Sequence, residues 1–137
     1  MNQDNSKDIV EVKKEYYESG ALWGESPYVN GKMHGLEKLY YESGVLYKEA
    51  PYVTGKKHGI EKHYYKTGAL WYETPYVNGK EHGVRKEYCY KTGVLRRETP
   101  YVNGEKHGVE RDYDKEGTEI YYLTLYDKDQ EVAFVRI

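Results

Sequence analysis

A repeating unit of 24 residues constrains the fold of this chain more than any other feature of its sequence. Glycines that open successive copies are spaced 24, 24, 25 and 24 residues apart: Gly20, Gly44, Gly68, Gly93 and Gly117. In the first four copies a leucine follows two residues after the glycine, and Pro-Tyr-Val begins seven residues after it. A period of this length indicates one small supersecondary unit stacked along the chain, because a single unit cannot bury its own faces.

Each copy contains two turn signals. Pro-Tyr-Val is followed by Asn-Gly or Thr-Gly, beginning at residues 30, 54, 78 and 103. Asn-Gly is the strongest short hairpin signal because both residues tolerate positive φ. The glycine that opens each copy supplies the second turn, which leaves two strands of about seven to nine residues. We therefore predict an all-β fold, an elongated single-layer antiparallel sheet of tandem β-hairpins.

The composition favours a thin sheet over a compact ball. The chain has 18 tyrosines and one phenylalanine, and its hydrophobic fraction is 38%, below the usual share of apolar residues. Tyrosine suits a half-buried surface because its ring can pack while its hydroxyl group stays in water.

The repeat pattern divides the chain into three segments. Residues 1–8 are polar and are predicted to be a flexible N-terminus. The repeat array covers residues 9–117, with a half-copy at 9–19 and copies starting at 20, 44, 68 and 93. The pattern fades in residues 118–137, which we expect to form a capping hairpin or a dedicated contact. One extra residue stands where Tyr88-Cys89-Tyr90 replaces Tyr-Tyr, and a β-bulge is its simplest interpretation.

Period-two alternation assigns the residues of each copy to two faces. Counted from the opening glycine as zero, the residue types shared by all copies are Leu at +2, Tyr at +8, an aliphatic residue at +16 and Tyr at +20. These are expected on one face. Positions +3 and +19 differ from copy to copy and are expected on the opposite face, whereas alternation places the variable position +4 on the first.

The variable positions are the predicted partner-binding residues. They are Trp23, Tyr47, Trp71, Tyr72, Leu39, His63, Glu87 and Asp112. Exposed Trp and Tyr side chains are favoured binding anchors. The change from Trp23 and Leu39 in the first copy to Asp112 in the last would suit a specific asymmetric partner. The alternative is that the aromatic side chains only cover the second face of the sheet.

Recurrent histidines and glutamates invite a metal or a catalytic interpretation. Equivalent histidines lie two strands apart, roughly 9–10 Å, whereas zinc needs its ligand atoms within about 2 Å of the metal. We expect each imidazole of His34, His58, His82 and His107 to satisfy backbone groups within its own turn. Four equivalent glutamates do not make one asymmetric catalytic constellation. We expect Glu25, Glu49, Glu73 and Glu98 to pair across strands with Lys38, Lys62, Lys86 and Arg111, or to keep the sheet soluble.

No motif in the sequence indicates an enzyme. A P-loop, a dinucleotide-binding glycine motif and a Ser-His-Asp order are all missing. Cys89 has no acid–base set near it in the sequence, so we expect an unreactive thiol. The prediction is therefore a protein without catalytic residues, cofactor or metal.

The charge balance restricts the class of partner. Lys and Arg total 21 against 23 Asp and Glu, the net charge is −2, and the two signs are interleaved. Nucleic-acid binders usually carry a basic stripe, and membrane-surface proteins a basic or amphipathic face. Neither nucleic acid nor a membrane is expected as the main partner. The N-terminus has no apolar run, so the cytoplasm is the expected location.

Residues 40–59 read Tyr-Tyr-Glu-Ser-Gly-Val-Leu-Tyr-Lys-Glu-Ala-Pro-Tyr-Val-Thr-Gly-Lys-Lys-His-Gly. This block resembles the MORN repeat (membrane occupation and recognition nexus), and more closely its bacterial variant. The resemblance covers about residues 12–117. The chain departs from the family pattern by carrying Pro at +7 and by the segment 118–137, which lacks the motif.

The resemblance implies a function as well as a fold. Many proteins of the variant family look like antitoxins or immunity proteins, so we expect this chain to bind a cognate toxin domain and to occlude its active site. The alternative is a structural MORN scaffold in a homo-oligomer or a membrane-associated assembly. A homodimer would use the apolar C-terminal hairpin and could coexist with toxin binding. Its candidate contact residues are Ile120, Leu123, Leu125, Val132, Phe134 and Val135.

Overall fold

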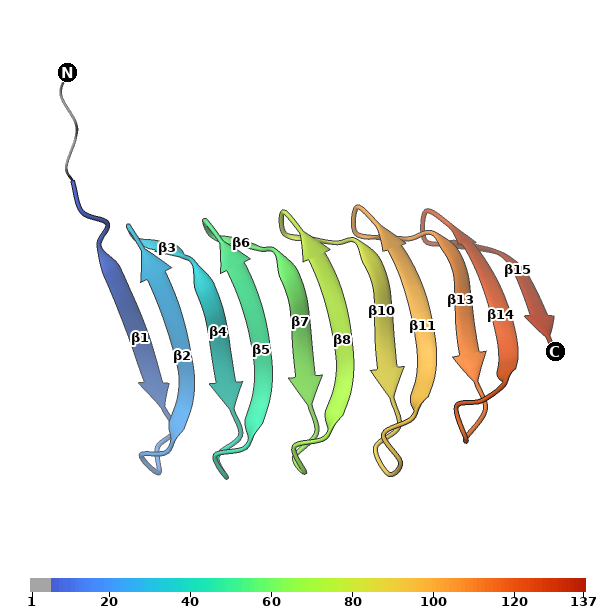
Figure 1. Ribbon diagram of the computed structural model, residues 1–137, viewed down its shortest axis with the longest axis horizontal. Helices are drawn as coiled ribbons and strands as arrows, with labels where there is room; N and C mark the ends of the chain where they lie inside the picture. Colours follow the sequence, from blue (N-terminus) through green and yellow to red (C-terminus); the bar gives the residue numbers. More distant parts are fainter. Residues whose placement is uncertain (1–5) are drawn as a thin grey trace, which may run out of the picture.

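The computed structural model describes residues 6–137, and this part of the chain contains only strands and turns (Figure 1). Successive long strands are hydrogen-bonded neighbours in one open antiparallel sheet. Their order is β1 (Val10–Tyr16), β2 (Leu22–Val29), β4 (Gly35–Tyr40), β5 (Leu46–Val53), β7 (Gly59–Tyr64), β8 (Leu70–Val77), β10 (Gly83–Tyr88), β11 (Leu95–Val102), β13 (Gly108–Tyr113), β14 (Ile120–Asp127) and β15 (Gln130–Arg136). The predicted all-β single-layer architecture is confirmed.

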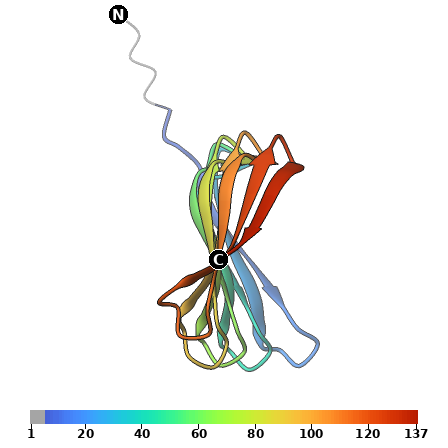
Figure 2. The ribbon, with the colours of Figure 1, turned by 90° about the vertical axis from the view of Figure 1, so that its right-hand side faces the viewer.

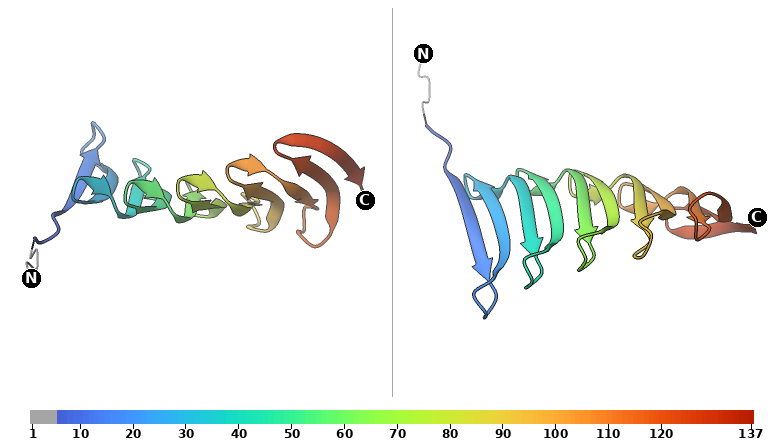
Figure 3. Two further views of the ribbon diagram at one scale, coloured as in Figure 1. Left: turned by 90° about the horizontal axis from the view of Figure 1, so that it is seen from above. Right: turned by 60° about the horizontal axis from the view of Figure 1, so that its bottom comes forward.

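The sheet is a long twisted ribbon. Seen along its axis, the first and last strands cross each other steeply (Figure 2). Seen from above, the described chain forms one thin layer that turns steadily from β1 to β15 (Figure 3). This twist is the normal consequence of the right-handed twist of each strand. β1 and β15 lie at opposite ends of the ribbon.

The Asn-Gly turns line the upper edge of the ribbon in Figure 1. Asn30 and Gly31 both have positive φ, 51° and 80°, and Val29 pairs with Lys32 across them. This is the backbone of a two-residue hairpin turn that matches the strand twist. Each turn leads into a two-residue strand that pairs back on the preceding long strand: β3 (Lys32–Met33), β6 (Lys56–Lys57), β9 (Lys80–Glu81) and β12 (Glu105–Lys106).

The N-terminal segment is fastened to the first of these turns. Asn30 Nδ2 donates to Asp8 Oδ1 at 2.9 Å, and Ile9 N donates to Asn30 Oδ1 at 2.9 Å. Of the residues 1–8 expected to be flexible, 1–5 lie outside the described residues, and Asp8 accepts the first of these bonds.

A β-bulge at position +3 recurs in every hairpin that the glycine-opened turns join, at the lower edge of the ribbon in Figure 1. Tyr40 pairs with Leu46 and Leu39 pairs with Lys48, so Tyr47 has no partner in the register between β4 and β5. The same shift leaves one extra residue in each of the other hairpins: Trp23, Trp71, Arg96 and Tyr121. A bulge re-aims the side chain it carries and restarts the alternation beyond it.

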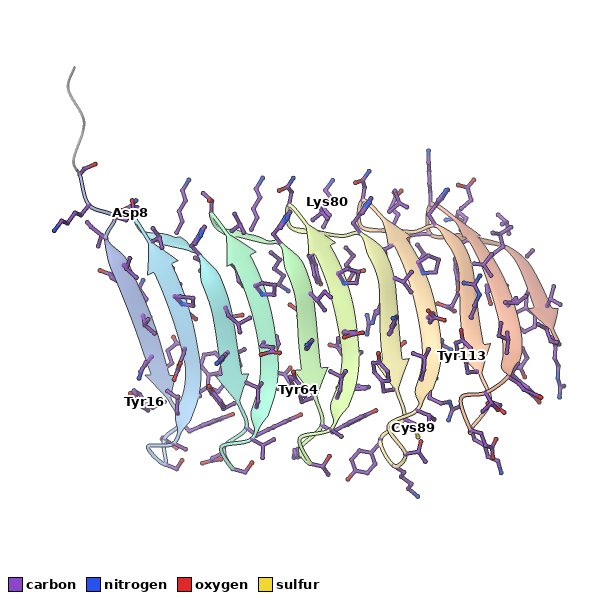
Figure 4. All side chains as sticks on the ribbon, in the orientation of Figure 1. Asp8, Tyr16, Tyr64, Lys80, Cys89 and Tyr113 are labelled. Atoms are coloured by element: carbon purple, nitrogen blue, oxygen red, sulfur yellow. The ribbon has the colours of Figure 1, made fainter. Side chains whose placement is uncertain are left out.

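The extra residue of the fourth copy lies elsewhere than expected. It lengthens the turn between β10 and β11. There Cys89 N donates to Val94 O at 2.8 Å, five residues along the chain, whereas in the ordinary turn Tyr41 N donates to Val45 O, four residues along. The interpretation of the Tyr88–Tyr90 insertion as a bulge is therefore wrong. Cys89, labelled in Figure 4, makes the backbone hydrogen bond that a tyrosine makes in the other turns, so it takes the place of a turn tyrosine.

The recurrent bulge also corrects the face assignment. Gly24 (+4) pairs with Leu39 (+19), and Tyr28 (+8) lies on the same face by alternation. The opposite face carries Glu at +5, Pro at +7, the aliphatic residue at +16 and Lys or Arg at +18. Positions +4 and +8 were expected with the aliphatic residue. They lie opposite it because the bulge resets the alternation between +2 and +4. We call the face with +3, +4 and +19 the variable face and the other the repeat face.

The buried residues of this thin sheet all project from the variable face. Ala50 is fully buried, and Thr74, Thr99 and Thr124 at the same position are nearly so. They share that face with the buried Glu61, His63 and Glu110, as the cross-strand registers show. Small side chains at this position let their larger neighbours close over the sheet, as close packing requires.

Candidate protein-binding face

The bulge at +3 gathers aromatic side chains on the middle of the variable face. Tyr47 contacts His63 with ring centroids 5.6 Å apart, and His63 stacks on Tyr72 at 4.3 Å. Trp71, the next bulge residue, meets Tyr72 edge to face at 5.1 Å. Such contacts are each worth about 0.5–1.5 kcal/mol beyond simple burial. We call Tyr47, His63, Trp71 and Tyr72 the aromatic cluster.

Turn tyrosines extend this cluster toward the lower edge of the ribbon. Tyr41 packs against Tyr47 at 5.2 Å, and Tyr65 stacks on Trp71 at 5.3 Å. Tyr90, the residue inserted in the fourth copy, contacts Tyr65 at 4.9 Å. Trp71 and Tyr90 remain 39% and 53% exposed. The insertion therefore adds one more solvent-facing ring beside the aromatic cluster.

The carboxylate of Glu61 makes two polar contacts beside the aromatic cluster, with His63 and with Lys57. His63 Nε2 lies 2.9 Å from Glu61 Oε1, and Lys57 forms an ion pair with the same carboxylate. Burial by itself raises the pKa of Glu61, but hydrogen bonds from His63 and Lys57 outweigh it and lower the pKa to about 2. The imidazole is thus held by a charge at its edge and by Tyr72 at its face, which fixes the cluster in one arrangement.

The variable face is hollowed between the aromatic cluster and the C-terminal hairpin. Arg97 Nε donates to Asp112 Oδ1 at 2.6 Å on its floor, and Thr99 Oγ1 donates to Glu110 Oε2 at 2.7 Å. Two adjoining hollows share three residues at their common boundary, namely Arg96, Arg97 and Asp112. Tyr65 and Trp71 line one of the hollows, and Tyr121, Tyr122 and Phe134 line the other.

The predicted binding residues fall into three groups along this face. Tyr47, His63, Trp71 and Tyr72 form the aromatic cluster, in which position +4 joins the face because of the bulge. Glu87 pairs with Tyr72 across strands β8 and β10, and Asp112 bonds Arg97. Leu39 on β4 and Trp23 on β2 lie further toward the N-terminus. Leu39 covers Gly24 so closely that a Cβ there would come within 2.8 Å of Leu39 Cδ2.

Several residues of the face were not predicted from the sequence. Tyr121 and Tyr122 continue positions +3 and +4 into the C-terminal hairpin, with rings 4.6 Å apart. The register of β13 with β14 makes them equivalent, although the motif has faded by then. The guanidinium group of Arg85 lies over the Tyr72 ring at 4.2 Å, a contact to which the repeat pattern gives no clue. A search for adjacent aromatic pairs would have found Tyr121 and Tyr122.

The repeat histidines join adjacent copies and not their own turns, contrary to expectation. Thr54 N donates to His34 Nδ1 at 3.2 Å, and Asn78 N donates to His58 Nδ1 at 3.4 Å. The backbone reinforces this link, because Gly55 N donates to Met33 O at 2.8 Å. Within residues 6–137 no three His, Cys, Asp or Glu side chains converge where they could hold a metal ion.

The repeat glutamates lie opposite the lysines with which they were expected to pair. Glu25 faces Lys38, and Glu49 faces Lys62 with an ion-pair distance of 4.0 Å. A second contact was not expected. The Tyr64 hydroxyl donates to Glu49 Oε1 at 2.8 Å, and Tyr88 and Tyr113 make the equivalent bond to Glu73 and Glu98 (Figure 4). The pKa of Tyr64 rises to about 12, through burial first and this hydrogen bond second.

The Cys89 thiol is more acidic than an ordinary cysteine. Hydrogen bonds from the side chain and backbone of Thr92, and from the backbone of Lys91, lower its pKa to about 7. The expectation of an unreactive thiol rested on the lack of an acid–base set in the sequence, and these local turn contacts were not visible there.

None of the residues from 6 to 137 belongs to a helix long and apolar enough to cross a membrane.

The family model of the MORN repeat variant matches residues 12–30, 33–54 and 57–78. The matched segments run from β1 to Asn78, which opens the turn after β8. The copy that begins at Gly93 lies outside the match but has the same bulge and the same strand pairing. No curated protein matches the chain.

Proposed function

Because the chain carries three repeats of the MORN variant family, we propose that it is a cytoplasmic immunity or antitoxin-like protein that binds a cognate toxin domain. The variable face is the binding surface. Neutralisation occurs by steric occlusion of the toxin's active site, which requires no catalytic group from this chain.

The observation that supports this proposal is the aromatic cluster beside a charged hollow. Trp71 and Tyr90 present half-exposed rings at the lower edge of the face, and Arg96 and Arg97 lie in the adjoining hollow. Aromatic and arginine side chains dominate binding hot spots between proteins. Rings already packed on neighbouring rings lose little conformational freedom when a partner binds.

The gradient along the variable face favours a folded, asymmetric partner. Its N-terminal end is apolar, with Trp23 and Leu39; its middle is aromatic; and its C-terminal part carries the Arg97–Asp112 pair. A uniform polymer or lipid surface would need no such change from copy to copy. A protein domain with a matching sequence of apolar and charged groups would use all of it.

A pull-down from the native cells, with this chain as bait, tests the proposal. The expected result is one stoichiometric partner that is toxic when expressed alone and harmless when co-expressed. The double variant Trp71→Ser, Tyr90→Ser is expected to lose this partner and its protective effect.

The matched control lies on the opposite face. Ile60 and Val84 are 50% and 42% exposed on the repeat face, so Ile60→Ser with Val84→Ser removes a similar exposed apolar area. This control should retain the partner. Loss of the partner in the control alone would place the binding surface on the repeat face. Recovery of lipid or of this chain alone would favour the scaffold function.

A further inference from the structure

The two outermost strands of the ribbon differ in how they protect their open edges. β1 (Val-Glu-Val-Lys-Lys-Glu-Tyr) carries Lys13 and Lys14 at its centre, whereas β15 (Gln-Glu-Val-Ala-Phe-Val-Arg) has four consecutive apolar residues there. Proteins commonly guard edge strands with lysine, proline or short length, because an unguarded edge pairs with other chains. We propose that β15 is the interface with a second copy of this chain, whose β15 pairs with it antiparallel and continues the sheet. This proposal is independent of the toxin-binding function.

Every residue of β15 is exposed in the single chain. Val132, Phe134 and Val135 are 55%, 56% and 52% exposed, so pairing of this strand with another would remove apolar surface from water. On its inner side the strand pairs with β14 from Asp127 and Gln130 to Tyr122 and Arg136, with one register shift at Val132. In the described part of the chain nothing covers its outer side, so its outward backbone groups are available to another strand.

The direction of the strands indicates which strand of a second copy pairs with β15. The path from β1 to β15 has eleven strands that alternate in direction, so the first and last strands point the same way (Figure 1). A head-to-tail contact of β15 with the β1 of another copy, with both variable faces on the same side of the sheet, would therefore be parallel. A two-fold axis perpendicular to the sheet makes two β15 strands antiparallel, and antiparallel pairs are slightly more stable per residue. That arrangement also closes as a dimer, so no fibre forms.

The side chains of β15 suit this two-fold pairing. The register with β14 shifts between Glu131 and Ala133 and leaves Val132 without a partner, so the regular part of the strand is Ala133–Arg136. Ile137 N donates inward to Tyr121 O, so by alternation the backbone groups of Phe134 point outward, and we place the two-fold axis there. An axis at this position places Phe134 opposite the partner's Phe134. Each ring already stacks on Tyr122 at 5.3 Å, so the contact joins two aromatic pairs. On the other face, Val135 meets the partner's smaller Ala133.

Sedimentation over a range of protein concentrations tests the interface. The wild-type chain is expected to change from monomer to dimer mass as concentration rises, and Val135→Lys to remain a monomer. The matched control is Val12→Lys on β1, because Val12 is 55% exposed at the other edge. This control should dimerise like the wild type. A wild-type chain that stays monomeric up to millimolar concentration, or a dimer that survives Val135→Lys, would overturn the proposal.

A cross-linking experiment tests the register without weakening the edge. With Cys89 replaced by serine, Phe134→Cys should form an intermolecular disulfide on mild oxidation, because directly opposite residues have Cβ atoms about 4.5–5.5 Å apart. Val12→Cys in the same background should stay monomeric. Efficient cross-linking through Val12, with none through Phe134, would also contradict the proposal. The dimer-deficient Val135→Lys chain should still recover the toxin partner, so failure of either proposal is distinguishable from failure of the other.

Discussion

The two faces of the ribbon are built by different means. The repeat face has the same contacts in successive copies, such as the Tyr64 hydroxyl to Glu49 at 2.8 Å and the Tyr88 hydroxyl to Glu73 at 3.1 Å. The variable face has contacts that occur once, such as the stack of His63 on Tyr72 and the Arg97–Asp112 ion pair. The bulge at +3 separates the two sets. One face can therefore hold the copies together while residues on the other vary without disturbing the stack.

The largest effect is expected from crowding the repeat face. Gly59 has φ +117°, and a Cβ there would come within 2.8 Å of Pro51 Cγ. Gly59→Ala should lower the free energy of unfolding by about 3 kcal/mol, because backbone strain and a close contact act together. Urea denaturation measures it. Gly55→Ala is the control, since Gly55 has φ +83° but open space around it, and it should cost about 1 kcal/mol.

The second-largest effect is expected from acid, which should lower the free energy of unfolding through the variable face. The Glu61 pKa is lowered from 4.5 to about 2 in the folded protein, so its ionised form stabilises the fold above pH 4.5. That contribution is lost as the pH falls from 4.5 toward 2. A shift of this size corresponds to about 2 kcal/mol once residual solvent screening is allowed for.

Comparison with Glu61→Gln isolates this contribution from the other carboxylates. The stability difference between wild type and variant, followed by urea denaturation at several pH values, should shrink between pH 4.5 and 2. A difference that stays constant over this range would mean that the pair with His63 and Lys57 contributes nothing.

Removing one hydroxyl from the repeat face should have a smaller effect. Tyr64→Phe loses the bond to Glu49 and should lower the free energy of unfolding by about 1 kcal/mol. Tyr90→Phe is the control, because its ring lies in the lower turn and is 53% exposed. Equal losses for the two variants would contradict a structural role for the tyrosine–glutamate bonds.

The smallest effect is expected from restoring the ordinary turn length between β10 and β11. The hydroxyls of Tyr17, Tyr41 and Tyr65 each donate to a backbone carbonyl of the next copy, and Cys89 occupies the equivalent place. Cys89→Tyr with deletion of Tyr90 restores the ordinary turn and should raise the free energy of unfolding by about 0.5 kcal/mol. The same variant should bind the partner more weakly, because it also removes an exposed ring from the variable face. A gain in both properties would show that the insertion serves neither.

Much of the fold could be predicted from local patterns. The turn at Asn30-Gly31 needs two residues with positive φ, and the 24-residue period places its equivalents without knowledge of any long-range contact. The shared face of +3 and +19 was also predicted. The faces of +4 and +8 were not, because simple alternation runs through Leu22, Gly24 and Tyr28 as if the strand were regular.

The sequence by itself determined the strands, their order and the positions that vary, because hairpin turns and period-two alternation depend on neighbouring residues. Only the tertiary structure decided which side chains meet. The bulge arises from the pairing of two strands, one of which has one residue more than its partner. The hydrogen bond between His34 and Thr54 joins two adjacent copies. The aromatic cluster likewise combines residues from β5, β7 and β8. Contacts of this kind depend on cross-strand register, which no single stretch of sequence contains.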